Sequence, residues 1–167
     1  EGTSYLWASA DGGVTWHSQT VSLPAGEWLV SISFGDGQRG WALSSDGNVF
    51  GTTNGGVTWN KLSQVDPTNG GWQSTFIPSQ IAFMNATEGW LMGNHRDNIY
   101  GGEETLWHTN NGGLSWTQVT SIPCSSGYGR AYRLAILASG KIWAAGYGDL
   151  NGFYKGPSMP LGPQVCY

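Results

Sequence analysis

The sequence is poor in charge and has no long apolar run. Charged side chains make up 11% of the 167 residues, only seven residues are Lys or Arg, and the net charge is −4. Such a chain offers no basic surface to a phosphate backbone, so we expect no nucleic acid partner. Its apolar runs stop far short of the ~20 residues that cross a bilayer, which predicts no membrane span.

Cysteine is also scarce, occurring only at Cys124 and Cys166. An even count is compatible with one disulfide, and two buried free thiols are the alternative. Asn85 opens an Asn-Ala-Thr glycosylation sequon, which matters only in a host that glycosylates. Together with the shortage of Lys, these features favour an extracellular or periplasmic protein. No segment resembling a signal peptide opens the chain, as expected of a mature or excised piece.

Histidine occurs three times and in no recognisable metal-binding pattern. His17, His95 and His108 have no ligand spacing with cysteines or carboxylates. We therefore expect neither a metal nor another cofactor.

Glycine and tryptophan are abundant, with 27 and 10 copies. Gly is a poor helix former and Trp is enriched in strands, so the composition predicts an all-β fold. A chain of 167 residues is long enough to bury a core and short enough for one domain, which we expect to span 1–167.

An eight-residue segment occurs three times without gaps. Its copies read Ser9-Ala-Asp-Gly-Gly-Val-Thr-Trp16, Thr52-Thr-Asn-Gly-Gly-Val-Thr-Trp59 and Thr109-Asn-Asn-Gly-Gly-Leu-Ser-Trp116. Strand-like runs flank the copies, so each copy is predicted to be a hairpin turn. The glycine pairs supply positive φ without a steric penalty.

Two positions of this segment have predicted structural roles. The third residue is expected to accept hydrogen bonds from the turn backbone; it is Asp11, Asn54 or Asn111. The last residue is expected to lie buried under its turn, contributing ~2–3 kcal/mol each time; it is Trp16, Trp59 or Trp116.

A second repeat lies between the turns. Its copies are Ile32-Ser-Phe34 with Gly40-Trp41-Ala-Leu43, Ile81-Ala-Phe83 with Gly89-Trp90-Leu-Met92, and a looser Leu134-Ala-Ile136 with Ile142-Trp143-Ala144. Combining both repeats gives a four-stranded unit in which the hairpin turn joins the third and fourth strands. The turn tryptophans are 43 and 57 residues apart. A propeller blade has ~40–50 residues, so the longer unit must carry inserted loops.

The order of the repeats predicts an incomplete ring. The chain begins with the third and fourth strands of one blade, continues with two full blades and ends with the first and second strands of a last blade, before a Pro-rich tail at 156–167. The total is about three blades, whereas propellers have four to eight. We therefore expect a partial propeller that is completed by oligomerisation or by a missing part of the chain.

The pattern Gly-Trp, then Leu-Trp-x-Thr-x-Asn-Gly-Gly-x-Ser-Trp, resembles the Asp-box (BNR) propellers. These include sialidases, xyloglucanase-like glycoside hydrolases, sortilin-type receptors and photosystem assembly factors, and the pattern looks closest to the last. In these families the Asp box lies away from the active site, so the resemblance implies fold strongly and function weakly. Two boxes carry Asn in place of Asp, which leaves the turn role intact.

The loops expected on the face opposite the boxes are the longer ones. They span 63–79, 94–104 and 121–130, and insertions gathered on one face often mark a binding face. Our candidate ligand-binding residues there are Trp72, His95, Arg96, Asp97, Tyr100, Glu103, Tyr128 and Arg130. Aromatic rings and polar groups of this kind suit a sugar or a peptide, and solvated loops without a ligand are the alternative.

An enzyme is the less favoured interpretation. A sialidase-like site needs an arginine cluster and a Tyr–Glu pair, for which the nearest set is Arg96, Arg130, Arg133, Tyr100 and Glu103. The Phe/Tyr-Arg-Ile-Pro motif of sialidases is absent. Another hydrolase would need two facing carboxylates, and Asp66, Asp97, Glu103 and Glu104 are candidates by loop position only. We therefore assign no catalytic residue.

The sequence as a whole favours a secreted binding or assembly module with a glycan or protein ligand. Two other hypotheses stay open. One is a fragment of an Asp-box glycoside hydrolase, and the other is a structural subunit that self-associates through its open blade edges.

Overall fold

The computed structural model describes residues 2–65, 74–97, 101–119, 130–137 and 140–147. These residues form twelve strands, and they contain no helix of the length and apolar character needed to cross a membrane. The strands are β1 (Gly2–Ala8), β2 (His17–Leu23), β3 (Leu29–Phe34), β4 (Gly40–Ser44), β5 (Asn48–Thr52), β6 (Asn60–Gln64), β7 (Ser74–Phe83), β8 (Gly89–Asp97), β9 (Gly101–Thr109), β10 (Thr117–Val119), β11 (Arg130–Ile136) and β12 (Ile142–Tyr147).

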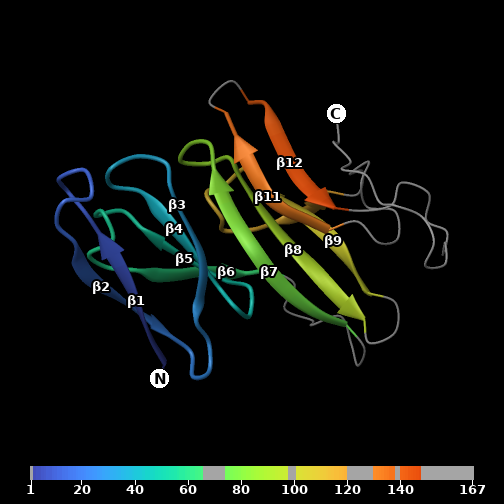
Figure 1. Cartoon of the computed structure of the whole chain (residues 1–167), viewed down its shortest axis with the longest axis horizontal. Coiled ribbons are helices and arrows are strands. Elements are labelled where there is room, and N and C mark those ends of the chain that lie inside the picture. Colours follow the sequence, from blue (N-terminus) through green and yellow to red (C-terminus); the bar gives the residue numbers. More distant parts are fainter. Residues whose placement is uncertain (1, 66–73, 98–100, 120–129, 138–139, 148–167) are drawn as a thin grey trace.

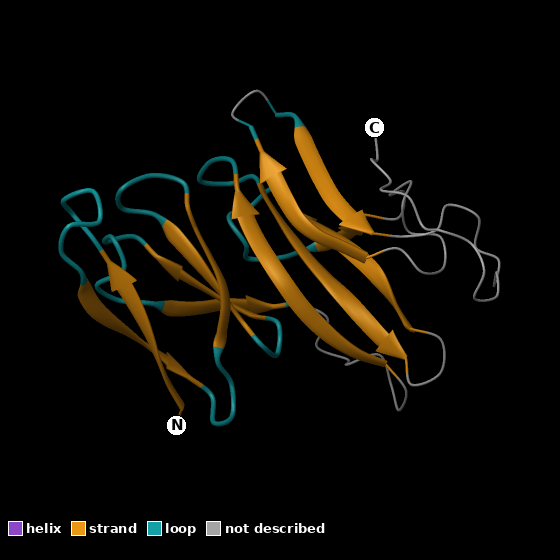
Figure 2. Cartoon of the chain, in the orientation of Figure 1, coloured by secondary structure: helices purple, strands orange, loops and turns teal. Residues whose placement is uncertain are grey.

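The strands pair in simple antiparallel succession into four sheets (Figures 1 and 2). Two sheets are four-stranded, β3-β4-β5-β6 and β7-β8-β9-β10. The other two have two strands each among the described residues, β1-β2 and β11-β12. The first strands β3, β7 and β11 contact one another in turn, so the sheets follow each other like blades. The all-β, partial propeller predicted from the repeats is confirmed.

Separate cores fill two of the interfaces between sheets. Between the two complete sheets the core comprises Trp41, Leu43, Val49, Val65, Phe76, Ile81, Phe83 and Leu91. Between β1-β2 and the next sheet it comprises Val21, Leu23, Ala42 and Phe50. The sheet β3-β4-β5-β6 is therefore apolar on both faces, as in a blade that lies between two others.

Trp41 on β4 joins the two complete sheets. Its ring stacks on Phe83 of β7 with centroids 3.6 Å apart and planes 4° from parallel. Its indole N–H donates to the carbonyl of Gly112, 2.8 Å away, in the turn between β9 and β10. The tryptophan therefore fixes both the spacing of the sheets and the position of the neighbouring turn.

Serine hydroxyls on β3 approach the backbone of β7. The N–H groups of Ile81 and Phe83 donate to the Oγ atoms of Ser31 and Ser33 over 3.2 and 2.9 Å. At the next interface, Gln80 accepts from the Leu134 N–H and donates to the Leu134 carbonyl over 2.7 and 2.9 Å. Side chains of one sheet thus bind the edge of the following first strand.

Each complete sheet pairs a phenylalanine with a glycine across its first two strands. Phe34 faces Gly40 and Phe83 faces Gly89 in the strand register. A Cβ on either glycine would lie 2.6 Å from the phenylalanine ring, so only glycine fits beneath it. In the β11-β12 sheet both members differ, and Ile136 faces Ile142.

The second and third Asp-box turns share one set of hydrogen bonds. In the second box, the Asn54 side-chain oxygen accepts from the Thr58 N–H over 3.0 Å, and the Asn54 amide donates to the Thr58 hydroxyl over 2.9 Å. The two glycines have φ of 68° and 88°, values that an L-residue with a Cβ rarely adopts. Asn111 makes the same contacts with Ser115.

The first box reverses the direction of one bond. Asp11 accepts from both the N–H and the hydroxyl of Thr15, over 2.9 and 2.6 Å. The Thr15 hydroxyl, the Thr15 N–H and the Ser9 hydroxyl lower the pKa of Asp11 to about 2. A carboxylate and a carboxamide therefore hold the same turn with different donors.

The tryptophans of the boxes differ in burial, and the prediction that Trp16 lies buried is wrong. Trp59 and Trp116 are partly buried and meet Phe34 and Phe83 edge to face at 6.1 and 6.0 Å. Trp16 is 55% exposed, because its sheet has no described strand equivalent to β3 or β7 that would carry such a phenylalanine.

We expect Gly89→Ala to destabilise the protein by ~1–3 kcal/mol, because its Cβ would overlap the Phe83 ring in the core. Gly37→Ala is the matched control, since a Cβ there meets nothing within 4 Å. Urea unfolding curves of the two variants measure both effects. Equal midpoints for the two variants would contradict the paired phenylalanine and glycine.

We expect Asp11 to make stability depend on acid. Its folded pKa is about 2 against 3.8, so its charged form stabilises the fold above pH 3.8, and this contribution is lost as the pH falls toward about 2. Asp11→Asn should flatten the loss of thermal stability in this range, and Asn54→Asp should steepen it. Melting temperatures measured from pH 5 to about 2 test both variants, and parallel pH profiles for all three proteins would refute this assignment.

Candidate functional site

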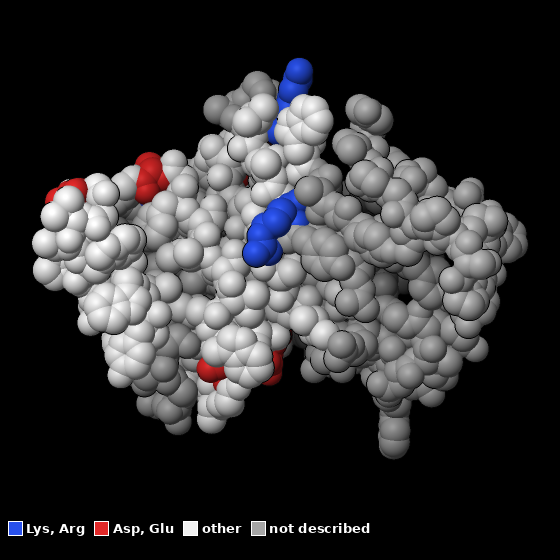
Figure 3. Space-filling view, in the orientation of Figure 1, with Lys and Arg blue, Asp and Glu red and all other residues white. Residues whose placement is uncertain are grey.

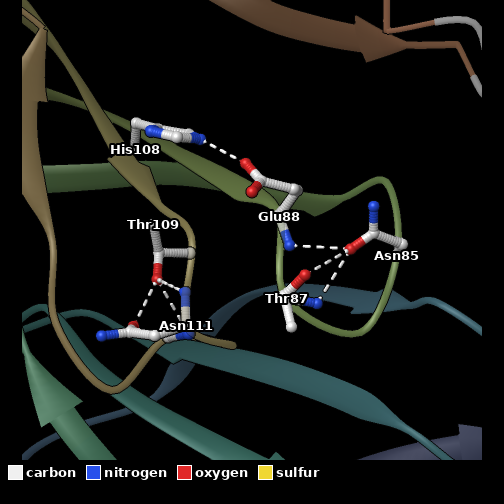
Figure 4. Close-up of polar contacts among 7 residues, drawn as sticks. Asn85, Thr87, Glu88, His108, Thr109 and Asn111 are labelled. Carbon is white, nitrogen blue, oxygen red and sulfur yellow. Dashed lines mark hydrogen bonds and ion pairs between the residues drawn. The ribbon is translucent and has the colours of Figure 1, made fainter.

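Counted along the chain, the third sheet is β7-β8-β9-β10. The end of this sheet where its Asp box lies carries a polar cluster (Figure 4). The side-chain oxygen of Asn85 accepts from the N–H groups of Thr87 and Glu88 over 2.9 and 2.8 Å. The Nε2 atom of His108 on β9 lies 2.7 Å from a carboxylate oxygen of Glu88, and its ring lies 4.9 Å from that of Trp90. Both members of the His108–Glu88 pair are 34% exposed, so the pair contributes at most ~1 kcal/mol.

The turn between β3 and β4 has the same hydrogen bonds as the turn of Asn85 between β7 and β8, and the sequence reasoning missed this turn. Asp36 accepts from the N–H groups of Arg39 and Gln38, each over 2.7 Å, and these bonds lower the pKa of Asp36. Asp36 and Asn85 both stand four residues before a Gly-Trp pair. That shared offset is the signal that identifies the turn.

The polar groups of the box end mainly bind one another. The N–H of Gly55 donates to the Gln38 carbonyl, and that of Gly112 to the Thr87 carbonyl, both over 2.9 Å, so each box is fastened to the first turn of its own sheet. Within the described residues no three His, Cys, Asp or Glu side chains form a group that could hold a metal. These hydrogen bonds hold the turns of each sheet together. Asn85 is exposed, and its glycosylation stays a prediction.

The opposite end of the third sheet is extended by longer strands. β7, β8 and β9 have 10, 9 and 9 residues, whereas β3, β4 and β5 have 6, 5 and 5. The prediction of a loop over 94–104 is therefore wrong for most of that span, since β8 continues to Asp97 and β9 begins at Gly101. Antiparallel pairing continues through these polar residues because backbone groups alone form the ladder.

The strand register arranges several of the candidate ligand-binding residues. His95 on β8 faces Glu103 on β9, and Arg96 and Asp97 face Gly102 and Gly101. Arg130 begins β11, which contacts β7. β7 and β11 begin at the end of the sheets where β8 stops. These candidates therefore gather at the end of the array of sheets that lies away from the Asp boxes. Trp72, Tyr100 and Tyr128 lie outside the described residues, as do Cys124 and Cys166.

The charged side chains are unevenly placed on the face that Figure 3 shows. Basic side chains lie over the part of the molecule formed by β11 and β12, and acidic ones lie toward the margins. Arg133 and Lys141 are exposed residues of β11 and of the turn before β12. Because β11 begins at the extended end of the third sheet, the turn that follows it, with Lys141, lies at the Asp-box end, and Arg133 lies midway along the strand.

Comparison with known proteins identifies the repeat. The profile of the family described as "Photosynthesis system II assembly factor YCF48" matches residues 8–127. The photosystem II assembly lipoprotein Ycf48 of Synechococcus sp. (strain CC9902) is 29% identical over 108 residues, which are 64% of this chain and 28% of that protein.

Two solved structures are similar in fold. A structure titled "YCF48 bound to D1 peptide" has 24% identity and a TM-score of 0.56, and the match covers 84% of this chain and 41% of that one. YCF48 from Cyanidioschyzon merolae has 16% identity and a TM-score of 0.62, with coverage of 85% and 41%. The chain thus spans less than half the length of each of these relatives.

The family profile covers well over half of this chain, and it includes all three Asp boxes. The predicted resemblance to photosystem assembly factors among the Asp-box propellers is confirmed. The chain belongs to the YCF48 family of photosystem II assembly factors.

Proposed function

We propose that this chain is a non-catalytic assembly module that binds an extended segment of a partner polypeptide. Membership of an assembly-factor family carries the proposal. A similar fold is known in a structure titled "YCF48 bound to D1 peptide", which gives the ligand class. The names of these relatives concern a photosystem and a peptide rather than a sugar, so we commit to a polypeptide ligand.

The proposed binding surface is the end of the array away from the Asp boxes. Three strands of the third sheet extend there, and paired strands hold their residues more rigidly than a loop of the same length. The candidates from the sequence that reach this end include Arg96, Asp97, Glu103 and Arg130. Arginine binds carboxylates through two parallel hydrogen bonds, so acidic side chains or a terminal carboxylate of the partner segment are suitable targets.

In the second and third Asp boxes the hydroxyl groups serve the turns. The hydroxyls of Thr58, Thr109 and Ser115 each bond to the asparagine of their own turn. A nucleophile needs a base within hydrogen-bonding reach, and these hydroxyls are instead held by neutral amides.

We propose a periplasmic rather than an extracellular location. The relative from Synechococcus is named a lipoprotein of photosystem II assembly. A factor that assists the assembly of a membrane complex must work beside that membrane, which a periplasmic protein does.

We expect the double variant Arg96→Ala with Arg130→Ala to bind a fluorescein-labelled D1 peptide roughly tenfold to a hundredfold more weakly, because charged hydrogen bonds are lost. Fluorescence anisotropy measures the affinity. Arg39→Ala, in the turn between β3 and β4 at the box end, is the control and should bind like the wild type. Unchanged affinity in the double variant would reject this surface, and no binding by the wild type at about 100 μM would reject the peptide ligand.

A further inference from the structure

Two of the three Asp boxes contain an asparagine that is followed directly by a glycine. Asn54 precedes Gly55, and Asn111 precedes Gly112. An Asn-Gly pair is prone to deamidation, because glycine has no side chain to hinder its backbone nitrogen as that nitrogen approaches the preceding carboxamide. The residue that defines the box is therefore chemically labile in two of its copies.

The reaction proceeds through a cyclic imide. The backbone nitrogen of the glycine loses its proton and attacks the Cγ atom of the asparagine. A C–N bond forms, and the side-chain nitrogen leaves as ammonia with the proton that the glycine lost. Water then opens the ring at one of its two carbonyls, which gives either aspartate or isoaspartate. Water is the only co-reactant, and the side chains of Asn54 and Asn111 are both exposed to it.

The nucleophile of each site is already bound. The Gly55 N–H donates to the Gln38 carbonyl, and the Gly112 N–H donates to the Thr87 carbonyl, both over 2.9 Å. An N–H in such a bond has to leave its acceptor before it can lose its proton and attack. The first turn of each sheet therefore occupies the nitrogen that would start the reaction.

The carboxamide of each site is held as well. The Asn111 oxygen accepts from the Thr109 hydroxyl over 2.8 Å and from the Ser115 N–H over 3.1 Å (Figure 4). The Asn111 amide donates to the Ser115 hydroxyl over 2.8 Å. Asn54 has the same three bonds within its own box. The carboxamide has to break these bonds before it can turn its Cγ atom toward the glycine nitrogen.

We propose that Asn54 and Asn111 are deamidation sites whose reaction rate is set by the opening of their own box. The closed box blocks the reaction, and each opening exposes the Asn-Gly pair until the box forms again. The aspartate product restores the box, since Asp11 holds the first copy by accepting from Thr15. Isoaspartate adds an atom to the main chain, so its box no longer closes on the same donors.

The whole chain, incubated at mildly alkaline pH, tests the proposal. Peptide mapping by mass spectrometry follows both sites, because the exchange of an amide for a carboxyl changes the mass, and the Asn54→Asp variant supplies the reference for the aspartate product. Each site should react roughly tenfold or more slowly in the folded chain than in the chain unfolded in guanidinium chloride. Equal rates in the two states would overturn the proposal.

Two variants open the boxes separately. Thr58→Val removes the hydroxyl that binds the Asn54 amide, and Ser115→Ala removes the one that binds the Asn111 amide. Each should raise the rate at its own asparagine about fivefold relative to the other, the factor that one lost hydrogen bond implies. Thr15→Val, the same change in the first box, is the matched control and should leave the ratio of the two rates unchanged.

The ratio of the two rates within one molecule cancels any change in overall stability. A variant that only unfolds more easily speeds both sites alike, so it does not imitate the opening of one box. An unchanged ratio in Thr58→Val and in Ser115→Ala would overturn the proposal. None of these measurements involves a partner polypeptide, so their outcome is separate from that of the proposed function.

Discussion

The stack of Trp41 on Phe83 is the contact on which the arrangement of the sheets depends. An antiparallel sheet that is apolar on both faces is stable only when both faces are covered. The flat tryptophan ring covers the phenylalanine of the next sheet, and its N–H binds the carbonyl of Gly112 in the next Asp box. The box is in this way also a point of attachment for the preceding sheet.

The stack of Trp41 on Phe83 is possible because the Phe83 ring lies close to the backbone of the neighbouring strand β8. The Phe83 ring lies over Gly89, where any side chain would lift it away from Trp41. The last sheet replaces both residues together, with Ile136 facing Ile142. A change at one position of this pair therefore requires a change at the other, because the phenylalanine ring and a branched side chain cannot share the same space.

Much of the fold could be predicted from the sequence because the repeats are local. Each eight-residue box contains its own donors, acceptors and glycines, so its hairpin could be inferred without knowledge of the neighbours. The exposure of Trp16 could not, because its burial depends on a phenylalanine from another strand. The continuation of β8 through His95, Arg96 and Asp97 was also missed, since polar residues carry no hydrophobic alternation. The segments 94–97 and 101–104, which were predicted to be loop, are therefore parts of strands.

The hydroxyls of Ser31 and Ser33 bear on how the gap between successive sheets is bridged. They reach the β7 backbone directly, whereas Gln80 spans the next step, from β7 to β11, with a longer side chain. A hydroxyl suffices at one step and a longer amide side chain is used at the next, so the residue at this position can match the gap between two successive first strands. Each gap in the array can in this way be bridged separately, by a residue that contributes to neither the apolar cores nor the turns.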